Sequence, residues 1–170
     1  MNFEIKDGVL EKTLDDDNQE KVVIPNNVTA IGNGAFSSCT SITSINIPES
    51  VVSIGERAFE DCDSLATVNS TGGNKLLRLL MLLRKLISKE KNSAVLSKNV
   101  QSIGKMAFVG CASLDSIEVD KKNNDYKTID GILYDKDVKT LLMCPSGKEV
   151  LLFQIPSQLL VIMLSMAVKS

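Results

Sequence analysis

The sequence predicts an α/β solenoid, in which repeated units of short strands and short helical turns stack along one axis. Three observations support this fold class. Segments of the 170-residue chain align with one another at a shift of 23 residues. Each segment alternates apolar and polar residues over a short stretch, as a half-buried strand does. Each also contains Ala-Phe-x-x-Cys, whose Phe and Cys would share one face of a helical turn.

The repeat is clearest in residues 22–45 and 45–68, and a third copy covers residues 99–119. The first two copies share their apolar and glycine slots: Ile24-Pro25 over Ile47-Pro48, Val28 over Val51, Ile31-Gly32 over Ile54-Gly55, Ala35-Phe36 over Ala58-Phe59, and Cys39 over Cys62. The third copy has Ile103-Gly104, Ala107-Phe108 and Cys111 in the same slots. Ile103 follows Ile54 by two periods and three residues, so one repeat is missing or hidden between residues 70 and 96.

Each part of the unit has a physical interpretation. The alternating stretch predicts a short strand with one buried face. Proline then ends the strand, because it offers no N–H to a ladder, and a second extended piece closes at the glycine. A unit of this size cannot bury its own apolar face, whereas stacked copies can. We therefore expect ladders of Phe, Ile and Cys along the core.

These motifs resemble the BspA-like leucine-rich repeat family, whose unit is roughly Ile-Pro-x-x-Val-x-x-Ile-Gly-x-x-Ala-Phe-x-x-Cys-x-x-Leu-x-x-Ile. The resemblance covers residues 22–69 and 96–119 well. It implies a horseshoe-like leucine-rich-repeat solenoid. It also implies a surface or secreted adhesion protein that binds other proteins, including host or extracellular-matrix proteins.

The repeats divide the chain into segments. Residues 5–10 echo residues 129–133 around an Asp-Gly pair, which predicts a capping hairpin before the first repeat. The expected organisation is a capping hairpin at 1–21, two intact repeats at 22–69, a degenerate or frame-slipped repeat at 70–95, a third intact repeat at 96–119, an inserted hairpin at 120–149 and an apolar repeat remnant at 150–170.

Residues 74–91 break the repeat and predict an irregular basic amphipathic helix. A membrane-surface or calmodulin-target-like helix is one interpretation. We favour a shifted reading frame. We can choose codons for residues 75–83 and read them from the third base of the first codon. This shifted frame encodes Val-Thr-Lys-Ile-Ala-Tyr-Ala-Ala, which is close to the expected repeat. The same shift works for residues 158–169, so both segments are interpreted as frame-slipped repeats in a decayed or wrongly assembled gene.

The C-terminal stretch 150–168 is apolar over about the length of a membrane span. Gln154, Pro156, Ser157 and Gln158 interrupt it and disfavour a transmembrane helix. The acidic N-terminal residues do not resemble a secretory signal, which has a basic start and an apolar run. This observation and the surface location that the resemblance implies disagree, so the sequence does not decide the compartment.

Composition disfavours most enzymes and nucleic-acid binders. The chain has 44% apolar residues, no histidine, 4% aromatic residues and a net charge of −2. Without histidine there is no Ser-His or Cys-His pair and no His metal ligand. The near-balanced charge disfavours nucleic acid as a partner, and the few aromatic residues disfavour a base-stacking platform.

The remaining candidates for chemistry are weak. Cys39, Cys62 and Cys111 recur at one slot, and Cys144 lies in the predicted hairpin. The sequence contains no Cys-x-x-Cys pair, the spacing that would indicate a metal site. A disulfide or thiol ladder is conceivable, but we favour small buried hydrophobes. The acidic run 15–17 lacks the ligand spacing of a calcium loop, and the carboxylates around Cys62 (Glu56, Glu60, Asp61 and Asp63) fit a solvated face better than a glycosidase-like pair.

The sequence therefore predicts a non-enzymatic module, without cofactor or metal, that offers an extended surface to protein partners. The expected binding face consists of exposed residues beside the strands: Thr43, Asn46, Ala66, Asn69, Asp115 and Glu118. Two alternatives stay open. One is a fragment or pseudogene product with no binding function, and the other is a module tethered to a membrane through residues 150–168.

Overall fold

The computed structural model describes residues 2–14, 19–70 and 92–145. Within these ranges the chain forms strands and turns and no helix. The strands are β1 (Phe3–Lys6), β2 (Val9–Thr13), β3 (Lys21–Val23), β4 (Ala30–Ile31), β5 (Ser44–Asn46), β6 (Ser53–Ile54), β7 (Thr67–Asn69), β8 (Ser93–Leu96), β9 (Ser102–Ile103), β10 (Ser116–Val119), β11 (Tyr126–Ile129), β12 (Ile132–Asp135) and β13 (Leu141–Met143).

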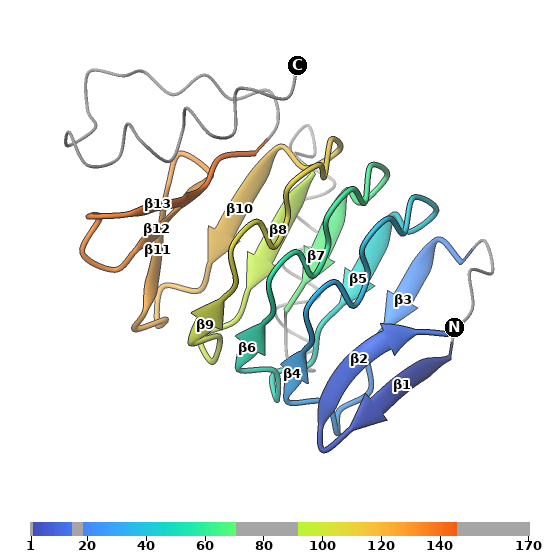
Figure 1. Cartoon of the computed structure of the whole chain (residues 1–170). Helices are drawn as coiled ribbons and strands as arrows, with labels where there is room; N and C mark the ends of the chain where they lie inside the picture. Colours follow the sequence, from blue (N-terminus) through green and yellow to red (C-terminus); the bar gives the residue numbers. More distant parts are fainter. Residues whose placement is uncertain (1, 15–18, 71–91, 146–170) are drawn as a thin grey trace, which may run out of the picture.

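The strands stack as coils of a solenoid, which confirms the predicted architecture (Figure 1). Sheet A has the order β1-β2-β4-β6-β9, and sheet B has the order β10-β8-β7-β5-β3. Strands β3, β5 and β8 of sheet B are each followed by a strand of sheet A, namely β4, β6 and β9, and a turn then leads back to sheet B. Neighbouring coils pair in parallel and in register, as Ile45 with Val68 and Ile31 with Ile54 show.

The core between the two sheets consists of ladders of equivalent residues, as the repeat predicts. Phe36, Phe59 and Phe108 stack with ring centroids 5.2 and 5.0 Å apart. Each such aromatic pair contributes about 1 kcal/mol beyond the area that it buries. The isoleucines of sheets A and B line the same core, and most are fully buried. Stacking therefore buries the apolar face that a single unit would leave exposed.

Close packing of backbones explains the glycine after each sheet A strand. A Cβ added to Gly55 would lie 2.6 Å from the backbone nitrogen of Asn33, and one added to Gly104 would lie 2.3 Å from that of Glu56. No side chain fits at these distances. The Ile-Gly pair of the repeat is thus a requirement of coil stacking.

The predicted short helical turns are wrong, and with them the α component of the fold class. Each Ala-Phe-x-x-Cys segment is a turn with two residues in the left-handed region, one before and one after the Ala-Phe pair. These residues are Gly34 and Ser38, Arg57 and Asp61, and Met106 and Gly110. Between them, alternate amides donate to the next coil, such as Phe36 N to Ala58 O at 2.8 Å and Phe59 N to Ala107 O at 2.8 Å. A helix would direct these groups along its own axis instead.

Among the described residues, the hidden repeat contributes β7 to the stack. In sheet B, β7 pairs with β8, with Val68 opposite Ala94. In sheet A, β6 pairs directly with β9, with Ile54 opposite Ile103. Sheet A and the Phe ladder are therefore continuous between the second and third intact repeats. The predicted helix at 74–91, the frame-slipped segments and the apolar tail at 150–170 lie outside the described residues.

Both ends of the stack have antiparallel strands. At the start, β1 and β2 form a hairpin through Asp7 and Gly8, both with positive φ, and β2 pairs with β4. Phe3 of this hairpin packs edge-on against Phe36 with a centroid distance of 6.4 Å. At the other end, β11, β12 and β13 form the three-stranded antiparallel sheet C, with a second Asp-Gly turn at Asp130 and Gly131.

Candidate functional site

Three of the predicted binding residues lie in one row on the outward face of sheet B. Alternation along each strand turns Ile45, Val68 and their equivalents into the core and leaves their neighbours outside. The strand registers then align five outward residues, one from each strand, which we call the outer row: Val23, Asn46, Asn69, Val95 and Glu118. Its strands lie side by side in Figure 1.

Two asparagines form the centre of the outer row. The side-chain Nδ2 of Asn69 donates to Oδ1 of Asn46 at 3.2 Å. Each amide keeps polar atoms beyond this bond, because a primary amide has two N–H donors and an oxygen that accepts twice. Asn46 is exposed and Asn69 is half-buried. The pair therefore leaves hydrogen-bond donors and acceptors on the outward face of sheet B.

The other three predicted residues lie one step before the strands and have structural roles. The hydroxyl of Thr43 donates to the carbonyl of Glu20 at 2.9 Å, and Oδ2 of Asp115 accepts from the backbone N–H of Asn92 at 3.1 Å. Ala66 donates its backbone N–H to the carbonyl of Thr43 at 3.0 Å. These contacts join adjacent coils, so Thr43 and Asp115 are less free to bind a partner than the outer row.

Sequence reasoning missed the two valines of the outer row. Val23 is 66% exposed, and Val95 is half-buried. The repeat spacing could have identified Val23, since it precedes Asn46 by one 23-residue period. It was hidden for Val95, which follows Asn69 by 26 residues because of the segment between β7 and β8.

Two of the recurring cysteines are buried in the core, and Cys39 is half-buried. Cys62 and Cys111 are fully buried, and their thiols donate to the carbonyls of Phe36 and Phe59 at 3.0 and 3.1 Å. Burial raises the pKa of the Cys62 thiol far above its ordinary value, with Cys111 and Cys39 adding to the effect, and it raises the pKa of Cys111 to about 12. Cys62 and Cys111 are free thiols. In the described ranges no group of His, Cys, Asp or Glu side chains is arranged to hold a metal ion.

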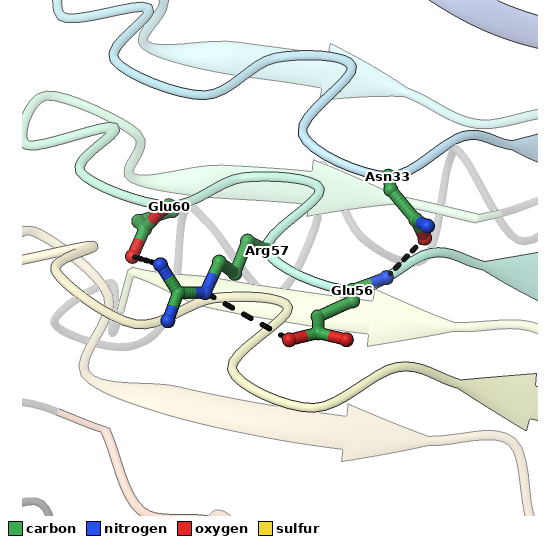
Figure 2. Close-up of polar contacts among 4 residues, drawn as sticks. All are labelled: Asn33, Glu56, Arg57 and Glu60. Atoms are coloured by element: carbon green, nitrogen blue, oxygen red, sulfur yellow. Dashed lines mark hydrogen bonds and ion pairs between the residues drawn. The ribbon is translucent and has the colours of Figure 1, made fainter.

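The carboxylates near Cys62 lie at an exposed corner between sheet A and the following turn. Figure 2 shows Arg57 between two of them, with Nη1 of Arg57 3.3 Å from Glu60 and Nε 3.9 Å from Glu56. The backbone N–H of Glu56 donates to Oδ1 of Asn33 at 2.8 Å. Exposed ion pairs of this kind contribute little energy, and the intervening guanidinium does not suit a catalytic carboxylate pair. The acidic run 15–17 lies outside the described residues.

Comparisons with known proteins agree with this architecture. The family model described as "BspA type Leucine rich repeat region" matches residues 9–78 and 87–133 with six copies. No curated protein matches the chain. No helix within the described ranges could span a membrane.

Several solved structures are similar to the chain in fold. The pneumococcal vaccine antigen PcpA is 19% identical, with a TM-score of 0.48, over 77% of this chain and 38% of its own. A leucine-rich repeat protein from Eubacterium ventriosum is 20% identical, with a TM-score of 0.43, over 84% and 45%. A leucine rich cell surface protein from Faecalibacterium prausnitzii is 19% identical, with a TM-score of 0.36, over 92% and 63%. The chain spans less than two thirds of each. On the family model, which matches more than half of its residues, the chain belongs to the BspA-type leucine-rich repeat family.

Proposed function

We propose that the chain is a non-enzymatic binding module whose partner is a protein held on the outward face of sheet B. The observation that carries the proposal is the outer row, in which five parallel strands present aligned side chains that the core does not need. A regular stack of this kind offers an extended surface, which is how repeat solenoids generally bind.

The chemistry of the outer row favours a protein partner over nucleic acid. The row has two amides in its centre, a valine on each side of them and a carboxylate, Glu118, at one end. It lacks the cluster of lysine and arginine that binding to phosphates requires. Mixed amide and apolar groups suit the polar backbone and small side chains of a protein surface. By family resemblance, we also propose that the protein acts at the cell surface and that its partners are host or extracellular-matrix proteins.

The experiment compares two double variants for binding to a panel of purified extracellular-matrix proteins. Asn46→Ala with Asn69→Ala removes the centre of the outer row, and Ser53→Ala with Ser102→Ala changes the outward face of sheet A as a matched control. We expect the first pair to raise Kd at least tenfold for any protein that the chain binds and the second to leave it unchanged. Equal affinity of both variants and the wild type would place binding elsewhere, and no binding to any member of the panel would contradict the choice of partner.

A further inference from the structure

The last strand of sheet A is closed by a side chain. Strand β9 pairs with β6 on one side. On its other side, the hydroxyl of Tyr126 accepts a hydrogen bond from the backbone N–H of Ile103 at 2.9 Å and donates one to the carbonyl of Gln101 at 3.2 Å. These are one donor and one acceptor of the kind that a further strand would pair with.

Tyr126 has the repeat position at which the next strand of sheet A would be expected. It follows Ile103 by 23 residues, so it is the equivalent of Ile31, Ile54 and Ile103. A tyrosine reaches further than isoleucine and ends in a hydroxyl, which can donate and accept at once. The next strand is thus replaced by a single polar group at the edge of the last one.

A second substitution in the same unit holds Tyr126 in place. Asn123 follows Val100 by 23 residues and takes the slot of the buried valines. Its Nδ2 donates to the carbonyls of Ser97 and Val100 at 3.0 and 2.8 Å, and its Oδ1 accepts from the backbone N–H of Asp125 and Tyr126, both at 2.8 Å. Asn123 is 1% exposed. The side chain therefore fastens the turn before Tyr126 to the coil beneath it.

A third substitution explains why the chain leaves the stack at this point. Lys127 takes the slot of Gly32, Gly55 and Gly104. Those glycines are packed so closely that a Cβ on Gly104 would lie 2.3 Å from a backbone atom of the preceding coil. A lysine in that slot cannot stack, and β11 turns away into sheet C. Within the described residues, sheet A ends at this unit, which carries all three substitutions, at residues 123, 126 and 127.

We propose that Tyr126 is a strand cap, whose hydroxyl closes the edge of β9 against pairing with a strand from a second copy of this chain. A second copy is the occupant because β1 and β9 are the two edge strands of sheet A, so another molecule of this chain presents an edge of the same sheet. Burial raises the pKa of Tyr126, so the hydroxyl remains protonated and able to donate throughout the neutral range.

Two variants test the cap. Tyr126→Phe removes only the hydroxyl, and Tyr126→Ile restores the residue that the other units have in this slot. Tyr134→Phe is the matched control, because Tyr134 is the second tyrosine and lies in sheet C. Hydrogen exchange measured by NMR should be at least tenfold faster at the Ile103 amide in Tyr126→Phe, relative to Ile54 of the same variant. Tyr134→Phe should leave this ratio unchanged.

The second readout is association in analytical ultracentrifugation. We expect Tyr126→Ile to sediment as a concentration-dependent mixture that includes dimers, whereas the wild type and Tyr134→Phe show no such change over the same range. An unchanged Ile103 exchange rate, or an equal rise at Ile54, would overturn the hydrogen-bond cap. Sedimentation of Tyr126→Ile like that of the wild type would overturn the closure against a second copy. If Tyr126→Ile does not fold, Tyr126→Phe decides both points, since its sedimentation and exchange are measured on the same sample.

Discussion

At the residue scale, Ser70 places a buried hydroxyl in the apolar core. It occupies the inward slot that holds Ile24, Ile47 and Leu96 in the other coils, since it follows Ile47 by 23 residues and precedes Leu96 by 26. It is 3% exposed, and its hydroxyl has no hydrogen-bond partner among the residues that the structure describes. A buried hydroxyl without a partner costs about 1–3 kcal/mol. The unit that begins with β7 therefore has a polar residue where the other units have an apolar core residue.

Ser70→Val should therefore stabilise the protein. The change removes the unpaired hydroxyl and restores apolar atoms to the ladder, so we expect the free energy of unfolding to rise by about 1–2 kcal/mol. Urea denaturation followed by circular dichroism measures it. Ser93→Val, on the half-buried outward face of β8, is the matched control and should change stability by less than about 0.5 kcal/mol. A loss of stability in Ser70→Val would show that the slot has no room for the larger side chain.

The buried thiols make stability fall in alkaline solution. Above the ordinary thiol pKa of 9.0, the unfolded chain loses protons at Cys62 and Cys111, while the folded chain keeps them. The unfolded state then binds fewer protons, so the free energy of unfolding decreases as pH rises. The stabilisation is complete below pH 9 and is lost as pH rises toward the folded pKa values. For two thiols, we expect a loss of about 2–3 kcal/mol between pH 8 and pH 10.

Urea denaturation at several pH values, with a reductant present, measures this loss. The Cys62→Ala, Cys111→Ala double variant is the control, because it removes both groups and should flatten the pH dependence over the same interval. Burial also raises the pKa values of Tyr126 and Tyr134 above the ordinary 10.0. Both tyrosines remain in the control, so the difference between the wild type and the double variant measures the thiols alone. An equally steep decrease in the double variant would assign the effect to other groups.

At the element scale, the glycine ladder sets the distance between coils. Gly104→Ala places a Cβ against the backbone of Glu56, which no rotation of a side chain can relieve. We expect a loss of about 3 kcal/mol in the free energy of unfolding, measured by urea denaturation. Gly34→Ala is the matched control: its Cβ would meet nothing closer than 3.8 Å, so only its positive φ of 61° is costly, by about 1 kcal/mol. Equal losses in both variants would mean that close stacking is not what requires glycine at 104.

The same scale shows what a sequence pattern can and cannot predict. The ladders of Phe and Ile and the need for glycine follow from the 23-residue period, since equivalent residues must stack. The turns do not follow, because a Phe and a Cys three residues apart suit a helix and a turn equally well. The left-handed backbone at Arg57 and Met106 decides between them, and neither residue type indicates it. The sequence predicts exposure beside the strands at Asn46, Asn69 and Glu118. It does not place Val95 in line with them, because the position of Val95 depends on how β8 pairs with β7.

At the scale of the whole molecule, the solenoid is a chain of nearest neighbours. Each coil contacts only the coils beside it, and the Phe ladder runs from Phe3 at one end to Phe108 near the other. Stability of such a stack is the sum of unit terms and interface terms, so local damage can stay local. The interface between β6 and β9 matters most here, because it joins coils that are separated by 49 residues in sequence.

A pair of variants at opposite ends tests this description. Phe36→Ala opens a cavity in the first coil, and Phe108→Ala opens one in the last intact coil. We expect each to cost about 3–5 kcal/mol locally. Hydrogen exchange followed by mass spectrometry should then rise most in β3–β6 for Phe36→Ala and most in β8–β10 for Phe108→Ala, with the increase fading toward the undamaged end. A uniform rise in both variants would mean that the stack unfolds as one cooperative unit. A rise that stops abruptly between β6 and β9 would mean that the interface between these two strands contributes little energy. The chain would then have two independently stable halves.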